Sequence, residues 1–185
     1  LNPCTFDSSK KYQFENSYFS NLIFKNPVVN SLDFTSNIII TGPNAAGKTT
    51  LLKNILFNTI INQQLGVGFY SKCNVIPYKF IHSYLNIPDT SGRDSLFQSE
   101  ARRCKNIITC IQENPNEKHF CIFDELYSGT NPLDAVSSAY GFLNYLNEYD
   151  VNYILTTHYT DLCKKFKKNK KIINKNMKIK KNITS

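Results

Sequence analysis

The segment GPNAAGKT, residues 42–49, places glycines, a lysine and a threonine at a spacing suited to holding phosphate groups. It matches the pattern G-x-x-x-x-G-K-[ST] between an apolar run and a helical pattern. Glycine lets backbone N–H groups wrap a phosphate, and the start of the following helix adds the positive end of its dipole. We expect Lys48 to reach the β- and γ-phosphates and the Thr49 hydroxyl to hold Mg²⁺. The predicted nucleotide-binding residues are Gly42, Pro43, Asn44, Ala45, Ala46, Gly47, Lys48, Thr49 and Thr50.

Two carboxylates, Asp124 and Glu125, end the apolar run CIFDE. Asp124 is predicted to bind Mg²⁺, directly or through water, and Glu125 to polarise an attacking water. His158 follows the run YILTT, which places it at the carboxyl end of a strand, where such sheets bind ligands. There it is predicted to sense the γ-phosphate, and the alternative is an ordinary surface or core histidine. The predicted catalytic residues are therefore Glu125, His158 and Lys48, and the predicted metal ligands are Thr49 and Asp124.

Short apolar runs alternate with helical patterns around these residues. Strands are predicted over residues 37–41, 119–124 and 152–159, with a weaker one over VIPYKFIHSY, residues 75–84. Helices are predicted over residues 47–63, from Ser95 to about Glu113, and from Asn131-Pro132, where Asn can cap and Pro suits the first turn. This order predicts an α/β fold with a mostly parallel sheet and helices on both faces.

The length and composition fit one globular domain, since the chain has 185 residues of which 41% are hydrophobic. No run of eighteen apolar residues and no signal-peptide pattern is present, so we expect an intracellular protein without membrane association. The six cysteines are scattered without a CxxC pair. This spacing predicts reduced packing residues rather than a disulfide framework or a zinc site.

The net charge of +8 comes from the end of the chain. Ten of the 22 Lys and Arg lie in residues 164–185, which contain no acid, leaving 12 basic against 14 acidic residues elsewhere. A basic tail can neutralise DNA phosphates. The alternation in KKIINKNMKIKK favours instead a solvated strand whose partner lies further downstream.

Together these segments resemble the ATPase domain of the MutS mismatch-repair proteins, within the ABC-type P-loop ATPases. The family patterns TGPN-x-x-GK-[ST]-T, DE-x-x-x-GT-x-x-x-[DE] and THY correspond to TGPNAAGKTT, DELYSGTNPLD and THY here, and S-T-F-x-x-E corresponds to SLFQSE at residues 95–100. The likeness covers about residues 27–165. We then expect residues 1–26 to be a lead-in from an upstream domain, and residues 166–185 to be a basic tail from a truncated strand region. A looser likeness is to short MutS-like proteins of large DNA viruses.

The resemblance implies ATP and Mg²⁺ as ligands, Asn44 beside Lys48 at the γ-phosphate, Glu125 as catalytic base and His158 as switch residue. It also implies a head-to-tail homodimer, or a heterodimer with another MutS-like chain, in which Ser95 completes the neighbour's site and Asp134 communicates across the interface. Two ordinary alternatives stand beside this. Ser95 with Gln98 forms a capping box, and Asp134 is a favourable acid in a helix's first turn.

The implied function is ATP hydrolysis coupled to DNA mismatch or DNA-structure handling, with DNA held mainly by domains absent from this chain. The alternatives are a nucleotide-dependent dimerisation module with little turnover, and another ABC-type ATPase of the SMC-like kind. Three departures from the family matter. Ala45-Ala46 replaces x-Gly, which we expect to require negative φ angles; Asp94 is inserted before Ser95; and Pro27 stands where the family has an aromatic that stacks on adenine.

Overall fold

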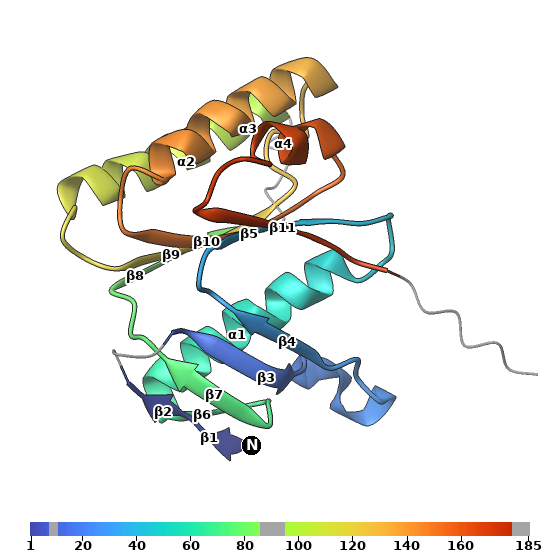
Figure 1. Ribbon diagram of the computed structural model, residues 1–185, viewed down its shortest axis with the longest axis vertical. Coiled ribbons are helices and arrows are strands. Elements are labelled where there is room, and N and C mark those ends of the chain that lie inside the picture. The colour runs from blue at the N-terminus through green and yellow to red at the C-terminus, as the bar shows by residue number, and fades with distance from the viewer. Residues whose placement is uncertain (8–10, 86–94, 179–185) are drawn as a thin grey trace, which may run out of the picture.

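The computed structural model of the protein describes residues 1–7, 11–85 and 95–178, and its centre is a five-stranded sheet (Figure 1). The strand order is β11-β5-β10-β9-β8, and all four pairings are parallel. The strands are β5 (Asn37–Thr41), β8 (Phe80–Tyr84), β9 (His119–Asp124), β10 (Val151–Thr157) and β11 (Ile172–Asn176). The predicted parallel sheet is confirmed.

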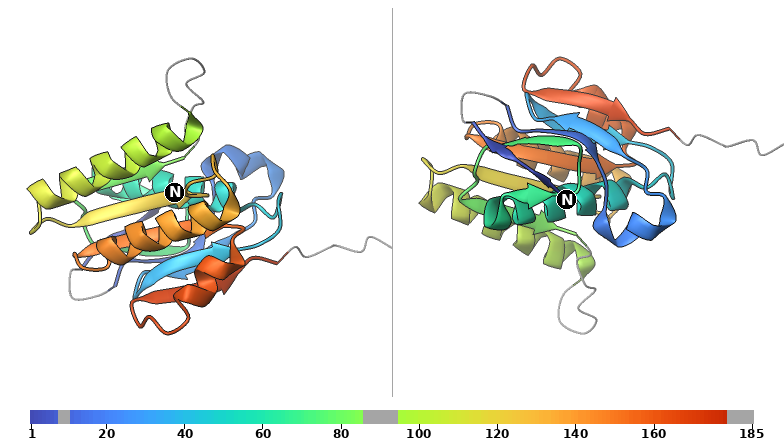
Figure 2. Two further views of the ribbon diagram at one scale, coloured as in Figure 1. Left: turned by 90° about the horizontal axis from the view of Figure 1, so that it is seen from above. Right: turned by 90° about the horizontal axis from the view of Figure 1, so that it is seen from below.

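Helices cover both faces of this sheet, as the alternation of strands and helices predicted (Figures 1 and 2). One face carries α1 (Lys48–Leu65), and the other carries α2 (Leu96–Glu113), α3 (Pro132–Leu146) and α4 (Thr160–Lys165). Strand β5 shows why its sequence is a continuous apolar run. Ile39 belongs to the core under α2 to α4, whereas Ile38 and Ile40 belong to the core under α1.

A second sheet lies on the far side of α1, with the strand order β2-β7-β3-β4 (Figure 1). Its strands are β2 (Thr5–Phe6), β3 (Gln13–Ser17), β4 (Asn30–Asp33) and β7 (Lys72–Val75), and a 3-10 helix, η1 (Ser20–Lys25), follows β3. A two-stranded pair joins β1 (Asn2–Pro3) to β6 (Val67–Gly68). Buried Tyr12 contacts the ring of Phe120 in the central sheet. Residues of the predicted lead-in therefore share a core with the central sheet, and the domain limits themselves stay a prediction.

The helix starts agree with the sequence. Ser95 caps α2 through a complete capping box with Gln98, and the Asn131 side chain accepts a hydrogen bond from the Asp134 N–H at the start of α3. The Asp94 insertion lies outside the described residues.

The single strand predicted over residues 75–84 is wrong. Val75 ends β7 in the second sheet, and Phe80 begins β8 in the central sheet. Pro77 lies in the connection, where its missing N–H and fixed φ disfavour a continuous strand.

The tail forms a strand, β11, but its partner is not a lost downstream segment. It pairs with β5 of the same chain, with Ile173 opposite Ile38. The Met177 N–H then donates to the Thr41 carbonyl at 2.7 Å. Residues 179–185, with the last two lysines, lie outside the described part of the chain.

All six cysteines are free. Within residues 1–7, 11–85 and 95–178, no helix is both long enough and apolar enough to cross a membrane.

Candidate functional site

The loop at residues 42–47 joins β5 to α1 through two residues in the left-handed region, Ala45 with φ 61° and Gly47 with φ 90°. The expectation of negative φ angles is therefore wrong for Ala45. A left-handed conformation costs an L-residue with a Cβ roughly 1–2 kcal/mol. Ala45 therefore adopts the left-handed conformation although its methyl group disfavours that conformation.

The ammonium group of Lys48 lies beneath this loop. Its Nζ donates to the carbonyl oxygens of Gly42 at 2.9 Å and Pro43 at 3.2 Å, and the residue is 6% exposed. Helix α1 begins here with Gly47 as its N-cap, which forms no side-chain cap hydrogen bond. No side chain of the cap residue therefore competes with an anion for the first N–H groups of the helix.

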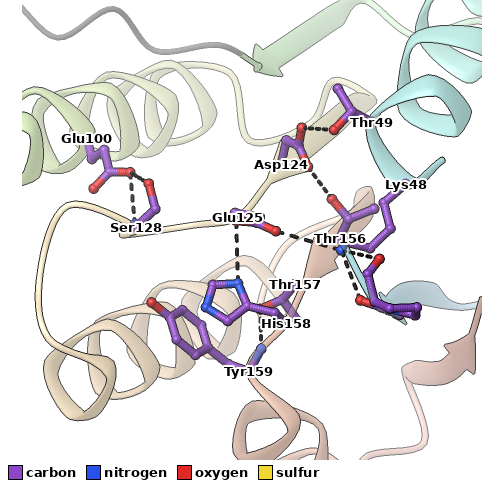
Figure 3. A network of polar contacts seen from close by, with 12 residues as sticks. Lys48, Thr49, Glu100, Asp124, Glu125, Ser128, Thr156, Thr157, His158 and Tyr159 are labelled. Atoms are coloured by element: carbon purple, nitrogen blue, oxygen red, sulfur yellow. Dashed lines mark hydrogen bonds and ion pairs between the residues drawn. The ribbon is translucent and has the colours of Figure 1, made fainter. Parts of the chain in front are cut away.

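Asp124, at the end of β9, connects α1 to β10. Its Oδ2 accepts a hydrogen bond from the Thr49 hydroxyl at 2.7 Å, and its Oδ1 accepts one from the Thr156 hydroxyl at 2.5 Å (Figure 3). The two predicted metal ligands, Thr49 and Asp124, are thus in direct contact. Thr156 was not predicted from the sequence.

Glu125 brings the three predicted catalytic residues together. One carboxylate oxygen lies 3.8 Å from Lys48 Nζ and the other 3.4 Å from His158 Nδ1 (Figure 3). Glu125 has φ 52°, and its N–H donates to the Thr156 carbonyl at 2.9 Å. His158 directly follows β10, as predicted, and its ring lies against Tyr159. Burial, and then the negative charges of Glu125 and Glu100, raise the pKa of Tyr159, so this phenol stays neutral.

Two polar cavities flank this cluster and share Thr49 and Glu125. One, of about 350 Å³, is lined by the loop, including Asn44, Lys48 and Thr50. The other, of about 340 Å³, is lined by Asp124, Leu96, Glu100 and Ser128 among others. The site is therefore open on both sides of the Glu125 carboxylate.

A third, mainly apolar cavity of about 250 Å³ lies beside the same loop. It shares Gly47 and Thr50 with the first cavity, and its other lining residues are Phe19, Leu22, Val28, Asn30, Ala46, Leu51, Asn54 and Met177. Met177 packs closely on the loop, because a Cβ at Gly42 would meet the Met177 Cβ at 3.0 Å. Pro27, which replaces the family's aromatic, is not among its lining residues.

Ser95 and Asp134 are exposed at the starts of α2 and α3, and neither lines the three cavities described above. Their side chains are engaged locally. Ser95 Oγ accepts from the Gln98 N–H at 3.3 Å, and the Asn131 side chain donates to Asp134 Oδ2 at 2.5 Å. The structure thus shows the capping roles, and the roles across a dimer stay predictions.

Glu100 has a role that sequence reasoning missed. This carboxylate, only 2% exposed, accepts hydrogen bonds from the N–H and hydroxyl of Ser128 (Figure 3). It also accepts one from the N–H of Gly129. Gly129 also packs tightly on α2, because a Cβ there would lie 2.7 Å from the Phe97 nitrogen. Helix α2 therefore fixes the loop that follows Glu125. The sequence signal that could have indicated this role is the final Glu of SLFQSE, which the family pattern also contains.

A family model described as MutS domain V matches residues 38–185. The protein named Endonuclease MutS2 from Staphylococcus haemolyticus is 30% identical over 161 residues, covering 85% of this chain and 20% of that protein. Its namesake from Streptococcus mutans is 30% identical over 144 residues, covering 76% of this chain and 18% of that protein. The one from Listeria monocytogenes is 32% identical over 130 residues, covering 70% and 16%. The chain thus spans at most a fifth of the length of these relatives.

Proposed function

The chain belongs to the MutS family, and on this premise we propose that it is the family's ATPase domain, binding ATP with Mg²⁺ and hydrolysing it to ADP and phosphate. One observation carries the proposal. Lys48, Thr49, Asp124, Glu125 and His158 come from the ends of two neighbouring parallel strands, β9 and β10, and the start of α1, and they gather around one glycine-containing loop. The carboxyl edge of a parallel sheet is where such folds bind nucleotides.

The residues at the loop fit Mg²⁺. Hydroxyl and carboxylate oxygens are the ligands this ion prefers, and Thr49 Oγ1 lies 2.7 Å from Asp124 Oδ2, so both can face one ion. Thr156 holds the other carboxylate oxygen and fixes the orientation of Asp124. When bound, Mg²⁺ supplies charge neutralisation at the phosphates.

Glu125 is the general base of the proposal. Its carboxylate lies between the Lys48 ammonium and the His158 imidazole, which hold it over the loop. There it can accept a proton from a water that attacks the γ-phosphate. Lys48, with its carbonyl partners Gly42 and Pro43, is placed to bind the β- and γ-phosphates. Asn44 lines the same cavity and is assigned to the γ-phosphate.

The apolar cavity beside the loop is the proposed place of the adenine base. It adjoins the phosphate-side cavity at Gly47 and Thr50, and Leu22, Val28 and Met177 give it aliphatic walls. Burial of the base among these apolar side chains would replace the stacking contact for which Pro27 offers no aromatic ring.

We further propose that two chains associate head to tail, with Ser95 at the exposed start of α2 facing the partner's γ-phosphate. Asp134 would lie in the interface. Hydrolysis is then coupled to DNA mismatch or DNA-structure handling by other parts of the full-length protein. The endonuclease activity in the relatives' name is not carried over, because the matched residues form at most a fifth of those proteins.

The test is the Mg²⁺-dependent ATP hydrolysis rate as a function of protein concentration. An ATPase whose site is completed across a dimer gains specific activity as it concentrates. A constant, buffer-level rate with ATP-dependent dimerisation would favour the alternative of a dimerisation module with little turnover. Since the chain belongs to the MutS family, the SMC-like alternative is not retained.

A further inference from the structure

Three side chains that bind transition metals, His82, Cys110 and His119, meet at the opposite end of β9 from Asp124. His119 begins β9, His82 lies in the neighbouring edge strand β8, and Cys110 lies in α2. One ligand atom from each residue lies within 4.8 Å of the other two. This cluster plays no part in the nucleotide site.

The register of the sheet brings the two imidazoles together. His82 lies opposite Cys121, two residues beyond His119, so both side chains are on the face that α2 covers. His82 Nε2 and His119 Nδ1 are 3.0 Å apart. Cys110 then approaches from the helix above.

The orientation of His119 is fixed by two contacts. Its Nε2 lies 3.0 Å from the carbonyl oxygen of Asn114, and its ring stacks on Phe80 with centroids 4.9 Å apart. A carbonyl oxygen only accepts, so Nε2 carries the hydrogen and the neutral ring presents a lone pair at Nδ1. A metal-binding histidine usually has this arrangement, with its second N–H donated to a carbonyl.

The distances suit a tetrahedral ion after small adjustments. Zn–N bonds of about 2.05 Å and a Zn–S bond of about 2.3 Å place two nitrogens about 3.3 Å apart and the sulfur about 3.6 Å from each. The two nitrogens here are 3.0 Å apart, and the sulfur lies within 4.8 Å of both. Rotation of the partly exposed Cys110 and His82 side chains supplies the difference.

We propose that His82 Nε2, Cys110 Sγ and His119 Nδ1 bind a transition metal ion of the Zn²⁺ class, with water in the fourth position. Binding exchanges the Cys110 thiol proton for the metal and moves the His82 hydrogen from Nε2 to Nδ1, so one proton is released. One thiolate and two imidazoles form a donor set that binds zinc in preference to magnesium, which favours oxygen ligands. The ion joins α2 to β8 and β9 and so stabilises the helix that begins at Ser95.

The experiment uses Co²⁺ as a spectroscopic probe, added to chelator-treated protein without ATP or Mg²⁺. We expect one equivalent of Co²⁺ to give a thiolate-to-cobalt charge-transfer band, which oxygen ligands such as Asp124 cannot produce. Excess Zn²⁺ should remove the band and raise the Tm by about 5 °C or more. Cys110→Ala should remove the band and weaken Co²⁺ binding by about 100-fold or more. Cys163 is also partly buried but lies outside the cluster, so Cys163→Ala is the matched control. This variant should retain the charge-transfer band and the wild-type affinity for Co²⁺.

The proposal is overturned if wild type shows no charge-transfer band, or if the band survives in Cys110→Ala. In either case, His82 and His119 would be only a hydrogen-bonded pair packed beside a cysteine. Circular dichroism checks that each variant is folded. If Cys110→Ala is not folded, His82→Gln takes its place, and retention of tight Co²⁺ binding in that variant also overturns the proposal.

Discussion

Glu100 accepts two hydrogen bonds from Ser128, one from its backbone N–H and one from its hydroxyl, both at 2.9 Å. The second carboxylate oxygen accepts the Gly129 N–H at 3.0 Å. A buried carboxylate with three donors links α2 to the loop that carries Glu125. The helix proposed to face a partner's nucleotide and the loop that holds the proposed catalytic base are therefore joined by these three hydrogen bonds.

Glu100→Ala should lower the free energy of unfolding by about 1–3 kcal/mol, because it removes three hydrogen bonds that a buried carboxylate accepts from the following loop. Urea denaturation followed by circular dichroism measures the change. Glu113→Ala, an exposed acid of the same helix, is the matched control and should change stability by less than about 0.5 kcal/mol. Equal effects of the two substitutions would show that the hydrogen bonds to Ser128 and Gly129 stabilise nothing.

Ala45 and Ala46 should respond in opposite directions to glycine. Ala45 has φ 61°, so Ala45→Gly relieves a left-handed alanine and should raise the free energy of unfolding by roughly 0.5 kcal/mol. Ala46 lies outside the positive-φ region, so Ala46→Gly should lower it by about 0.5–1 kcal/mol. The difference between the two midpoints in urea measures the strain at Ala45. A destabilised Ala45→Gly protein would contradict the loop conformation.

Substitutions at Ser95 separate its capping role from its proposed role across a dimer. Ser95→Ala should cost about 1 kcal/mol of stability, whereas Ser95→Asp keeps a capping oxygen and should retain most of it. At high protein concentration, both should bind ATP nearly normally but hydrolyse it more slowly, the Asp variant because its charge would repel the γ-phosphate. Hydrolysis by Ser95→Asp at the wild-type rate, or an equal loss of rate in isolated monomers, would contradict the dimer role.

The apolar cavity can be tested by comparing ATP with inorganic tripolyphosphate. Leu22→Gln should weaken ATP binding about fivefold to tenfold, since an aliphatic wall of the cavity is lost, and should leave tripolyphosphate binding unchanged. The adjacent Ile23→Gln changes an exposed side chain that does not line the cavity and is the control. Calorimetric titration gives both affinities. An equal loss for both ligands would place the base elsewhere.

Much of the fold could be predicted from the sequence, because the pattern of apolar residues along each segment agrees with the burial of that segment in the structure. The run NIIIT became β5 with the predicted limits, since a strand buried on both faces needs apolar residues at every position. The site residues followed from the same logic. The carboxyl end of β9 carries Asp124 and Glu125, and the carboxyl end of β10 carries His158. Both ends lie beside the loop that follows β5.

Features that depend on which strands pair, or on hydrogen bonds from backbone N–H groups, could not be predicted from the sequence. The sequence around Pro77 reads as one apolar run, although its two halves enter different sheets. The donors to Glu100 include the backbone N–H groups of Ser128 and Gly129, which carry no residue signature. His82 and His119 meet only through the register of β8 on β9, so the scattered cysteines gave no sign that Cys110 joins them.

The most direct test of the ATPase assignment is single-turnover hydrolysis of radiolabelled ATP by wild type and by Glu125→Gln, with Mg²⁺ and at high protein concentration. A general base contributes about 10²–10⁴-fold, so Glu125→Gln should hydrolyse ATP at least about 100-fold more slowly while still retaining bound ATP. The exposed acid substitution Glu117→Gln should behave as wild type. Equally slow hydrolysis by wild type and Glu125→Gln would contradict the assignment of this chain as an ATPase.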